Sequence, residues 1–305
     1  MKPFIVRPSM ILKHDDCPAA YDYQYVQGIR TDSVSVNLSF GTASHAGATG
    51  WLEADALGKH FDPVDAFKAE WKKALENEVL SFPSDKTPED YEKIGLRLME
   101  SFPESWKASG LTVLIDPQGQ PVVERRLQSR IAPGIILSGQ PDVFAVNEDF
   151  DVVLPDIKTP ATPSAPFFAT ASEQLTSYQL LAEDEKNKAL LGIDRVDLLG
   201  FYEGIKRKVP KTKSGKGPTW EKPLLASRHS DRQVNDLVRK AMEMKRDHDR
   251  GYFPKRPRMA FNTPCAMCDF RNWCHNGDPT GLVWKKKKTD QEIAGNRIAA
   301  VAVNQ

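Results

Sequence analysis

The chain has 305 residues, of which 27% are charged and 40% hydrophobic, and its formal net charge is +1. This composition is typical of a globular protein with one large domain or two small ones, and the near-neutral balance leaves only local basic patches as surfaces for nucleic acid. The N-terminus has no sustained apolar run, and no segment approaches the ~20 apolar residues of a membrane helix. We therefore expect no signal peptide, no membrane partner, and a cytoplasmic location, or the host cytoplasm if a phage encodes the protein.

Helical patterns dominate the chain up to residue 110. Residues 40–58 have the character of a helix despite their glycines, and residues 63–80 and 88–108 carry apolar side chains at helical spacing. Pro88 followed by two acidic residues makes a favourable first turn for the last of these helices. A short helix is also expected around the aromatic run at residues 21–25.

After residue 110 the pattern changes to strands, and helices return later. Strand-like runs occur at Leu111–Ile115, Val122–Leu127, Ile135–Ser138, Val143–Val146, Asp151–Leu154 and Val196–Tyr202. Helices are expected over residues 167–185 and 230–250, and a basic, turn-rich hairpin over residues 204–222. This order predicts an α/β fold with a mixed β-sheet, helices on its faces, and helical segments at both ends of the chain.

The stretch Gly139–Lys158 reads GQPDVFAVNEDFDVVLPDIK and contains two of these strand-like runs. Asp142 stands at the head of the first run and Asp156 just after the second, so antiparallel pairing of the two runs brings both carboxylates together. Lys158 follows Asp156 by two residues and, in an extended segment, faces the same way. Two carboxylates and an ammonium group suit a divalent cation such as Mg²⁺ or Mn²⁺ and a phosphate.

Three short patterns resemble the PD-(D/E)XK nuclease superfamily. They are Gly139-x-x-Asp142, Asp156-x-Lys158 and Gln174-x-x-x-Tyr178. The version is that of the RecB-like branch, which includes CRISPR-associated and helicase-linked DNA exonucleases. The resemblance implies a restriction-endonuclease-like core, with the helical N- and C-terminal segments joined by a metal cluster.

The resemblance also assigns roles. A metal held by Asp142, Asp156 and His45 would lower the pKa of a bound water and polarise the phosphate. The backbone carbonyl of Ile157 would complete the shell. Lys158 would position the water or stabilise the developing negative charge.

Three further residues have weaker individual signals. Gln174 and Tyr178 are spaced i, i+4 and share one helix face, from which they would contact the DNA backbone or orient Lys158. Glu124 matches a common upstream acidic residue of the branch, although a strand carboxylate facing solvent is the alternative. His45 taken alone is more often a packed or surface histidine than a metal ligand.

The chain has four cysteines, too few for a disulfide framework in a chain of this length, and they suggest one four-ligand site. They are Cys17, Cys265, Cys268 and Cys274. Spacing alone leaves tetrahedral Zn²⁺, an iron–sulfur cluster and unligated thiols open. The distant N-terminal cysteine with a C-terminal C-x2-C-x5-C resembles the 4Fe–4S site of the same nuclease branch. A cluster there would connect the two ends of the chain and contribute folding free energy.

Basic residues gather in three places. One run comprises Lys206, Arg207, Lys208, Lys211, Lys213 and Lys216, a second comprises Lys255, Arg256 and Arg258, and a third is Lys285–Lys288. The first is either a solvated loop or a basic arm that binds the DNA backbone and releases counterions. The second run would line the same DNA-binding channel as this arm, and the third belongs to a flexible tail.

The predicted organisation is a single RecB-like nuclease domain over residues 1–280 and a basic tail over 281–305. Within the domain we expect a helical part over 1–110, the catalytic core over 111–203, the basic arm over 204–222, and the C-terminal helix with the cysteines over 223–280.

The predicted function is a divalent-metal-dependent DNA nuclease, an exonuclease on single-stranded DNA or DNA ends. It would serve recombination, repair, phage DNA processing or CRISPR adaptation, with recombination, replication or CRISPR adaptation proteins as candidate partners. The sequence contains no Walker A motif, so no ATP motor is expected. The alternatives are a non-catalytic DNA-binding module of the same fold and a zinc-stapled structural or adaptor protein.

Overall fold

The structure, a computed structural model, describes residues 3–210, 215–256 and 264–285. It divides into two compact units, one formed by Met1–Leu12 with Ser33–Arg250 and the other by Lys13–Asp32 with Gly251–Gln305. The single domain over residues 1–280 stays a prediction. The basic tail predicted over residues 281–305 lies outside the described residues from 286 onward.

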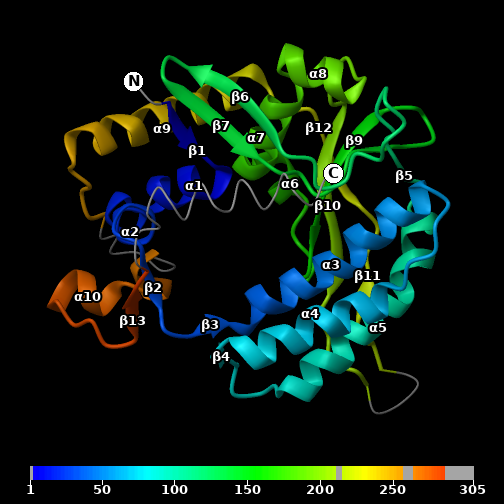
Figure 1. The fold of residues 1–305 in the computed structure, drawn as a ribbon, viewed down its shortest axis with the longest axis horizontal. Coiled ribbons are helices and arrows are strands. Elements are labelled where there is room, and N and C mark those ends of the chain that lie inside the picture. Colours follow the sequence, from blue (N-terminus) through cyan, green and yellow to red (C-terminus); the bar gives the residue numbers. More distant parts are fainter. Residues whose placement is uncertain (1–2, 211–214, 257–263, 286–305) are drawn as a thin grey trace, which may run out of the picture. The chain divides into compact units, whose positions relative to one another are not determined.

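A six-stranded mixed sheet forms the centre of the first unit (Figure 1). Its strands β9 and β10 run parallel, whereas the other pairs are antiparallel, which confirms the predicted mixed sheet. In order across the sheet the strands are β11 (Thr219–Trp220), β10 (Leu198–Ile205), β9 (Val152–Lys158), β8 (Ala145–Val146) and β5 (Thr112–Val113), and β12 (Leu224–Ser227) also pairs with β10.

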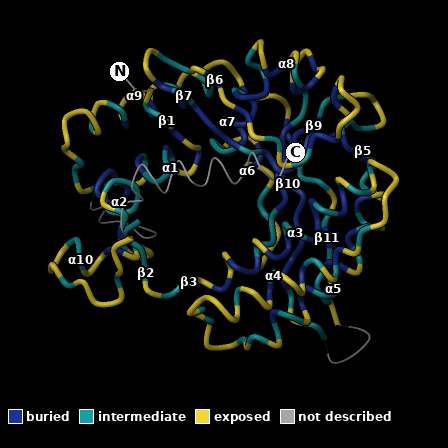
Figure 2. Tube along the Cα trace, viewed as in Figure 1, coloured by how far each residue is buried: buried dark blue, intermediate teal, exposed yellow. Residues whose placement is uncertain are grey.

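Strands β9 and β10 are the buried centre of this sheet, since β9 has intermediate exposure only at its two ends and β10 only at its first residue (Figure 2). The predicted antiparallel pairing of the runs around β8 and β9 is confirmed by the register Ala145↔Val153. The predicted end of the second run at Leu154 is wrong. The strand continues to Lys158 because it pairs in parallel with β10 as far as Glu203.

Three helices, α3 (Val36–Ala56), α4 (Pro63–Asn77) and α5 (Pro88–Ala108), pack with the sheet around one hydrophobic core. They confirm the three helices predicted in this part. Helix α3 tolerates its glycines because they allow close packing: a Cβ added at Gly47 would lie 2.5 Å from the sulfur of Met99. The side chain of Thr87 caps α5 in a reciprocal pair with Asp90, in agreement with the predicted first turn.

The remaining elements of the first unit surround this core. They are a three-stranded sheet of β1 (Phe4–Val6), β7 (Ile135–Gly139) and β6 (Leu127–Ala132), the pair β3 (Val34–Ser35) and β4 (Leu80–Ser81), and the helices α6 (Phe167–Ala171), α7 (Glu173–Ala182), α8 (Glu185–Leu191) and α9 (Asp231–Arg250). Helix α1 (Pro8–Asp16) begins in this unit.

Two of the predicted boundaries need correction. The expected strand Val122–Leu127 forms only an isolated bridge at Val123, because the left-handed backbone of Glu124 interrupts the extended segment, and the regular strand begins at Leu127. The expected helix over 167–185 is divided at Ser172, whose extended backbone ends α6 and whose hydroxyl caps α7. The hairpin expected over 204–222 is present as the pairing of β10 with β11.

The second unit consists of short elements around a small core of Ala20, Ile29 and Phe270. Its elements are α2 (Pro18–Tyr21), the π-helical turn η1 (Asp22–Val26), β2 (Ile29–Thr31), the 3₁₀ turn η2 (Pro264–Met267), α10 (Arg271–Asn276) and β13 (Leu282–Trp284). The helix expected around the aromatic run is therefore present. None of the described helices is long and apolar enough to cross a membrane.

Candidate functional site

Asp142 lies against strand β9 in the first unit. The pairing of β8 with β9 returns the chain so that Asp142 Oδ2 accepts a hydrogen bond of 2.7 Å from the backbone N–H of Ile157. The Asp142 side chain is buried. The pattern Gly-x-x-Asp and the pattern Asp-x-Lys therefore meet at one place on the sheet.

Asp156 and Lys158 face the same side of β9, as alternate residues of a strand do. Lys158 Nζ lies 2.6 Å from Asp156 Oδ2, and Gln174 Nε2 donates to Asp156 Oδ1 at 3.2 Å. The buried Oδ2 of Asp156 has this ionic partner but no hydrogen-bond donor of suitable geometry among the described residues. It is thus an acceptor with capacity left for a cation or a substrate group.

His45 comes to the same place from helix α3. Its Nε2 lies 2.7 Å from the carbonyl oxygen of Ile157, and its Nδ1 lies 3.5 Å from Asp142 Oδ1. A carbonyl oxygen only accepts, so Nε2 donates in this contact. The imidazole, the Asp142 carboxylate and the Ile157 carbonyl therefore converge.

Gln174 and Tyr178 approach from helix α7 on one face, where Gln174 Nε2 also donates to the Tyr178 hydroxyl at 3.0 Å. Gly139 explains how the helix comes so close. A Cβ at this position would lie 2.6 Å from Leu181 Cδ1 and 3.3 Å from Tyr178 Cε1. The glycine of the Gly-x-x-Asp pattern therefore sets the distance between β7 and α7.

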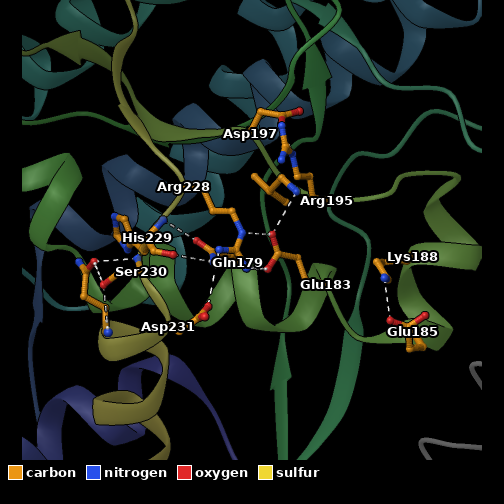
Figure 3. A network of polar contacts seen from close by, with 12 residues as sticks. Gln179, Glu183, Glu185, Lys188, Arg195, Asp197, Arg228, His229, Ser230 and Asp231 are labelled. Atoms are coloured by element: carbon orange, nitrogen blue, oxygen red, sulfur yellow. Dashed lines mark hydrogen bonds and ion pairs between the residues drawn. The ribbon is translucent and has the colours of Figure 1, made fainter.

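The opposite side of α7 is fixed by a polar network that Figure 3 shows. The side-chain amide of Gln179 accepts from the backbone N–H of His229 at 2.8 Å and donates to its carbonyl oxygen at 3.1 Å. Glu183 accepts two hydrogen bonds from Arg228, at 2.9 and 2.8 Å. This bidentate pair and the amide pair hold α7 against the segment that leads from β12 into α9.

Glu124 belongs to the same site, and its backbone conformation is unusual. Its φ of 46° is in the left-handed region, which non-glycine residues seldom adopt. Its N–H donates to the carbonyl oxygen of Asp142 at 2.8 Å, which holds it there. Such local strain is often found at functional sites.

The electrostatics of the site favour a bound cation. Burial, with the neighbouring Asp156 as the second cause, raises the pKa of Asp142 to about 7. Burial favours the neutral amine of Lys158, but the two carboxylates outweigh it and raise its pKa. Burial raises the pKa of Tyr178, which keeps its hydroxyl protonated. A cation would let both carboxylates ionise at neutral pH.

The fit to Mg²⁺ or Mn²⁺ rests on donor chemistry. Two carboxylates, an imidazole and a backbone carbonyl oxygen lie at one place, and oxygen-rich sets of this kind suit these ions. Over residues 3–210, 215–256 and 264–285, no group of three or more His, Cys, Asp or Glu side chains is arranged to hold a metal ion. The partly unsatisfied Asp156 and the raised pKa of Asp142 nevertheless fit a cation.

A cavity of about 850 Å³ opens at this site. Its wall includes four of the predicted site residues and several residues that were not predicted to belong to the site. The predicted ones are His45, Glu124, Ile157 and Lys158, and the additional polar or aromatic ones are Asn37, Ser164, Phe168, Phe201, Glu203 and Lys206. Only Lys206 of the additional set had a sequence signal, as the first residue of the basic run.

The four cysteines line one cavity of about 190 Å³ in the second unit. None of the four is in a disulfide bond, and burial raises the pKa of the Cys268 thiol. Among the described residues, the thiols are not arranged as a group that could hold a metal ion. Sequence-distant cysteines are thus gathered around one space, with the metal itself left to a proposal.

The basic residues differ in their surroundings. Lys206 is buried, whereas Arg207 pairs with Glu221 and Lys208 with Asp85. In the second unit, Lys255 donates to the carbonyl oxygen of Cys274, and Arg256 pairs with Asp15. Lys211, Lys213, Arg258 and residues 286–288 lie outside the described residues.

Comparison with known proteins identifies the family. The family model of the PD-(D/E)XK nuclease superfamily matches residues 8–275. A solved structure named "Crystal structure of SSO0001" is 11% identical, with 90% of this chain and 87% of that chain covered and a TM-score of 0.35. No curated protein matches the chain. The chain belongs to the PD-(D/E)XK nuclease superfamily, whose members are generally nucleases that use Mg²⁺ or Mn²⁺.

Proposed function

We propose that the protein is a divalent-metal-dependent deoxyribonuclease, an exonuclease of the RecB-like type that acts on single-stranded DNA or DNA ends. One observation carries the proposal. Residues of the three superfamily patterns and His45 come together around Asp156 and Ile157, at the wall of one open cavity. Recombination, repair, phage DNA processing and CRISPR adaptation are the pathways that use such an activity.

Asp142, Asp156, His45 and the Ile157 carbonyl are the groups that would hold Mg²⁺ or Mn²⁺. When bound, the ion supplies Lewis-acid polarisation of the phosphate and favours ionisation of the attacking water. The two carboxylates repel each other in the protein alone, and this repulsion is the second cause of the raised pKa of Asp142. A cation bound between the two carboxylates would therefore remove this repulsion.

Lys158 supplies a fixed positive charge to the phosphate. Asp156 anchors its ammonium at 2.6 Å, and the raised pKa keeps it protonated. Tyr178 accepts from Gln174, so its own O–H remains available to donate to a phosphate oxygen. Donors fixed before the substrate arrives stabilise developing charge without reorganisation.

The preference for unpaired DNA is supported by an aromatic pair. Phe168 lies in the cavity wall, and its ring stacks on Phe167 with centroids 4.5 Å apart. The two residues are 50% and 61% exposed, which is unusual for phenylalanine. Exposed rings beside a phosphodiester site are suited to stacking on the bases of a single strand.

For the second unit we propose a 4Fe–4S cluster on Cys17, Cys265, Cys268 and Cys274, with Zn²⁺ as the alternative. The four thiols line one cavity, and the core around them is small, so a bound metal would supply much of the folding free energy. An anaerobic preparation should be brown and contain iron and sulfide, and Cys268→Ser should lose both. A colourless protein with zinc and no iron would support the alternative.

The enzymatic proposal is tested with end-labelled single-stranded, duplex and circular DNA at varied Mg²⁺ and Mn²⁺. We expect linear single strands to be shortened from their ends while circles persist. Circles degraded as fast as linear strands would overturn the exonuclease assignment. A wild type that binds DNA but never cuts it, with the same affinity as Asp156→Ala, would instead identify a non-catalytic DNA-binding module.

A further inference from the structure

Lys206 occupies a place that its sequence context conceals. It follows strand β10 directly and starts the basic run, yet it is only 6% exposed. It lines the same cavity as His45 and Lys158. A lysine expected in a solvated loop or a basic arm is therefore part of the wall of the candidate active site.

The contacts of Lys206 hold its ammonium in one position. Nζ donates to Asn37 Oδ1 at 2.7 Å and lies 5.4 Å from the ring centroid of Phe40. Its backbone N–H donates to the carbonyl oxygen of Pro160 at 2.9 Å. The side chain is thus fixed between the end of the sheet and the start of helix α3.

No carboxylate balances this charge in the part of the chain that the structure describes. The nearby Glu203 already accepts from the backbone N–H and the hydroxyl of Ser164. The next charged neighbour is Lys86, a second cation, whose Nζ lies 3.5 Å from the carbonyl oxygen of Lys206. Burial, with Lys86 as the second cause, lowers the pKa of Lys206 to about 8.

An ammonium group buried without an anion is costly, and an apolar side chain would pack there at no such cost. A charge kept in a cavity wall at this expense points to an anionic ligand that enters the cavity. Asn37 and the Phe40 ring keep the ammonium oriented, which lowers the cost of binding such a ligand.

The sheet register separates Lys206 from Lys158. Lys158 pairs with Glu203 across β9 and β10, and Lys206 lies three residues further along. This offset corresponds to about 10 Å along the strand direction. The two lysines are therefore placed to contact different phosphates of one strand.

We infer that Lys206 binds the backbone phosphate of a nucleotide next to the one that is cleaved, and so fixes the path of a single DNA strand through the cavity. This inference rests on the proposed nuclease function for the identity of its ligand. It assigns to Lys206 a role in binding and not in the chemical step.

The test measures binding of a short labelled single-stranded oligonucleotide in EDTA, where no cleavage occurs, over a range of salt concentrations. Each phosphate contact on single-stranded DNA contributes about 0.7 to the slope of log K against log salt. Lys206→Gln is expected to lower the slope by about 0.7 and the affinity by roughly tenfold. Lys206→Arg keeps the charge and should retain the wild-type slope.

Lys72→Gln is the matched control, since Lys72 is exposed on α4 and pairs with Glu76. It should leave slope and affinity unchanged. An unchanged slope in folded Lys206→Gln would overturn the inference, as would an Arg variant that loses the slope. If Lys206→Gln does not fold, Lys206→Met keeps the stem without the charge. If neither Lys206→Gln nor Lys206→Met folds while Lys206→Arg does, the ammonium group has a structural role, and the inference is overturned.

The nuclease proposal and this inference fail separately. If wild-type protein binds the oligonucleotide but does not cut it with Mg²⁺ or Mn²⁺, the proposed function fails while the slope comparison still decides the role of Lys206. If wild type cuts and Lys206→Gln has the same slope and the same KM, only the inference on Lys206 fails.

Discussion

The two candidate metal sites are built in opposite ways. The acidic site of the first unit takes most of its side chains from β9, α3 and α7, which are seven, 21 and ten residues long, and only Asp142 from a bend after β7. The cysteine cavity of the second unit takes its thiols from in or beside α2, η2 and α10, which have four, four and six residues. Long, regular elements position most of the first set, whereas short turns position the second.

The difference lies in what each site needs in order to exist. In the acidic site, the proposed carboxylate ligands already have hydrogen-bond partners within the protein. The backbone N–H of Ile157 donates to Asp142, and the side chain of Gln174 donates to Asp156. In the second unit, the core contains three buried residues. We therefore expect the first unit to keep its fold without metal, and the second to depend on its metal for stability.

Replacement of Asp156 should have the largest effect on activity. Asp156→Ala removes a proposed metal ligand and the anchor of Lys158, so we expect the cleavage rate to fall roughly 10³-fold or more. The fold should persist, because the substitution also relieves the repulsion on Asp142. Single-turnover cleavage and circular dichroism measure the two effects, and a variant that cuts at the wild-type rate contradicts the assignment.

Replacement of Cys268 should have the largest effect on stability. Binding free energies of roughly 10 kcal/mol are available to structural thiolate sites, so Cys268→Ser should unfold the second unit while the first keeps its own thermal transition. Limited proteolysis and metal analysis show this. Met267→Leu, at an exposed position in the same turn, is the control. Unchanged metal content in Cys268→Ser would contradict the expectation that the second unit depends on a thiolate-bound metal for its stability.

Gly139→Ala tests how far the first unit is fixed by packing. The added Cβ meets Leu181 at 2.6 Å and pushes α7 away from β7. We expect a loss of about 1–3 kcal/mol in unfolding free energy and a lower kcat, because Gln174 and Tyr178 move with the helix. Gly41→Ala, whose Cβ meets no atom within 4 Å, should not lower the Tm. Equal Tm values for the two variants would contradict this account of the glycine.

Asp142→Asn should change the pH dependence of stability in the metal-free protein. The pKa of Asp142 is raised from 3.8 to about 7, so the folded state binds its proton more tightly than the unfolded chain does. The wild type therefore loses stability as the pH rises from about 4 to 7. Asp142→Asn lacks this loss and should have the higher Tm above pH 7 in EDTA.

Mn²⁺ should reduce the difference in Tm between Asp142→Asn and the wild type, because a cation favours the ionised carboxylates of the wild type. Thermal denaturation at several pH values, with and without the ion, gives both results. Parallel pH profiles for wild type and Asp142→Asn in EDTA would show that burial of Asp142 has no such consequence.

Much of the acidic site was open to prediction because its patterns are local. The alternation of Asp156 and Lys158 on one strand face and the helical spacing of Gln174 and Tyr178 each need only a few residues of sequence. The pairing of β8 with β9 also follows from a short connection. Such features depend little on the rest of the fold.

What could not be predicted depends on tertiary contacts. The extended run Val122–Leu127 is interrupted at Glu124, whose left-handed backbone is held by a hydrogen bond to Asp142, and β9 extends to Lys158 because a parallel partner continues. Lys206 has the sequence context of a solvated loop, yet Asn37 and Pro160, both distant in the chain, bury it. No local sequence pattern indicates these tertiary contacts.

The central claim is that Lys158 and its acidic neighbours cut DNA. The most direct measurement is the initial rate of nucleotide release from end-labelled single-stranded DNA with Mg²⁺, for wild type and Lys158→Ala side by side. Loss of one preorganised charge predicts a rate about 10²–10³-fold lower for the variant, at an unchanged Tm. Equal rates for the two proteins would contradict the claim.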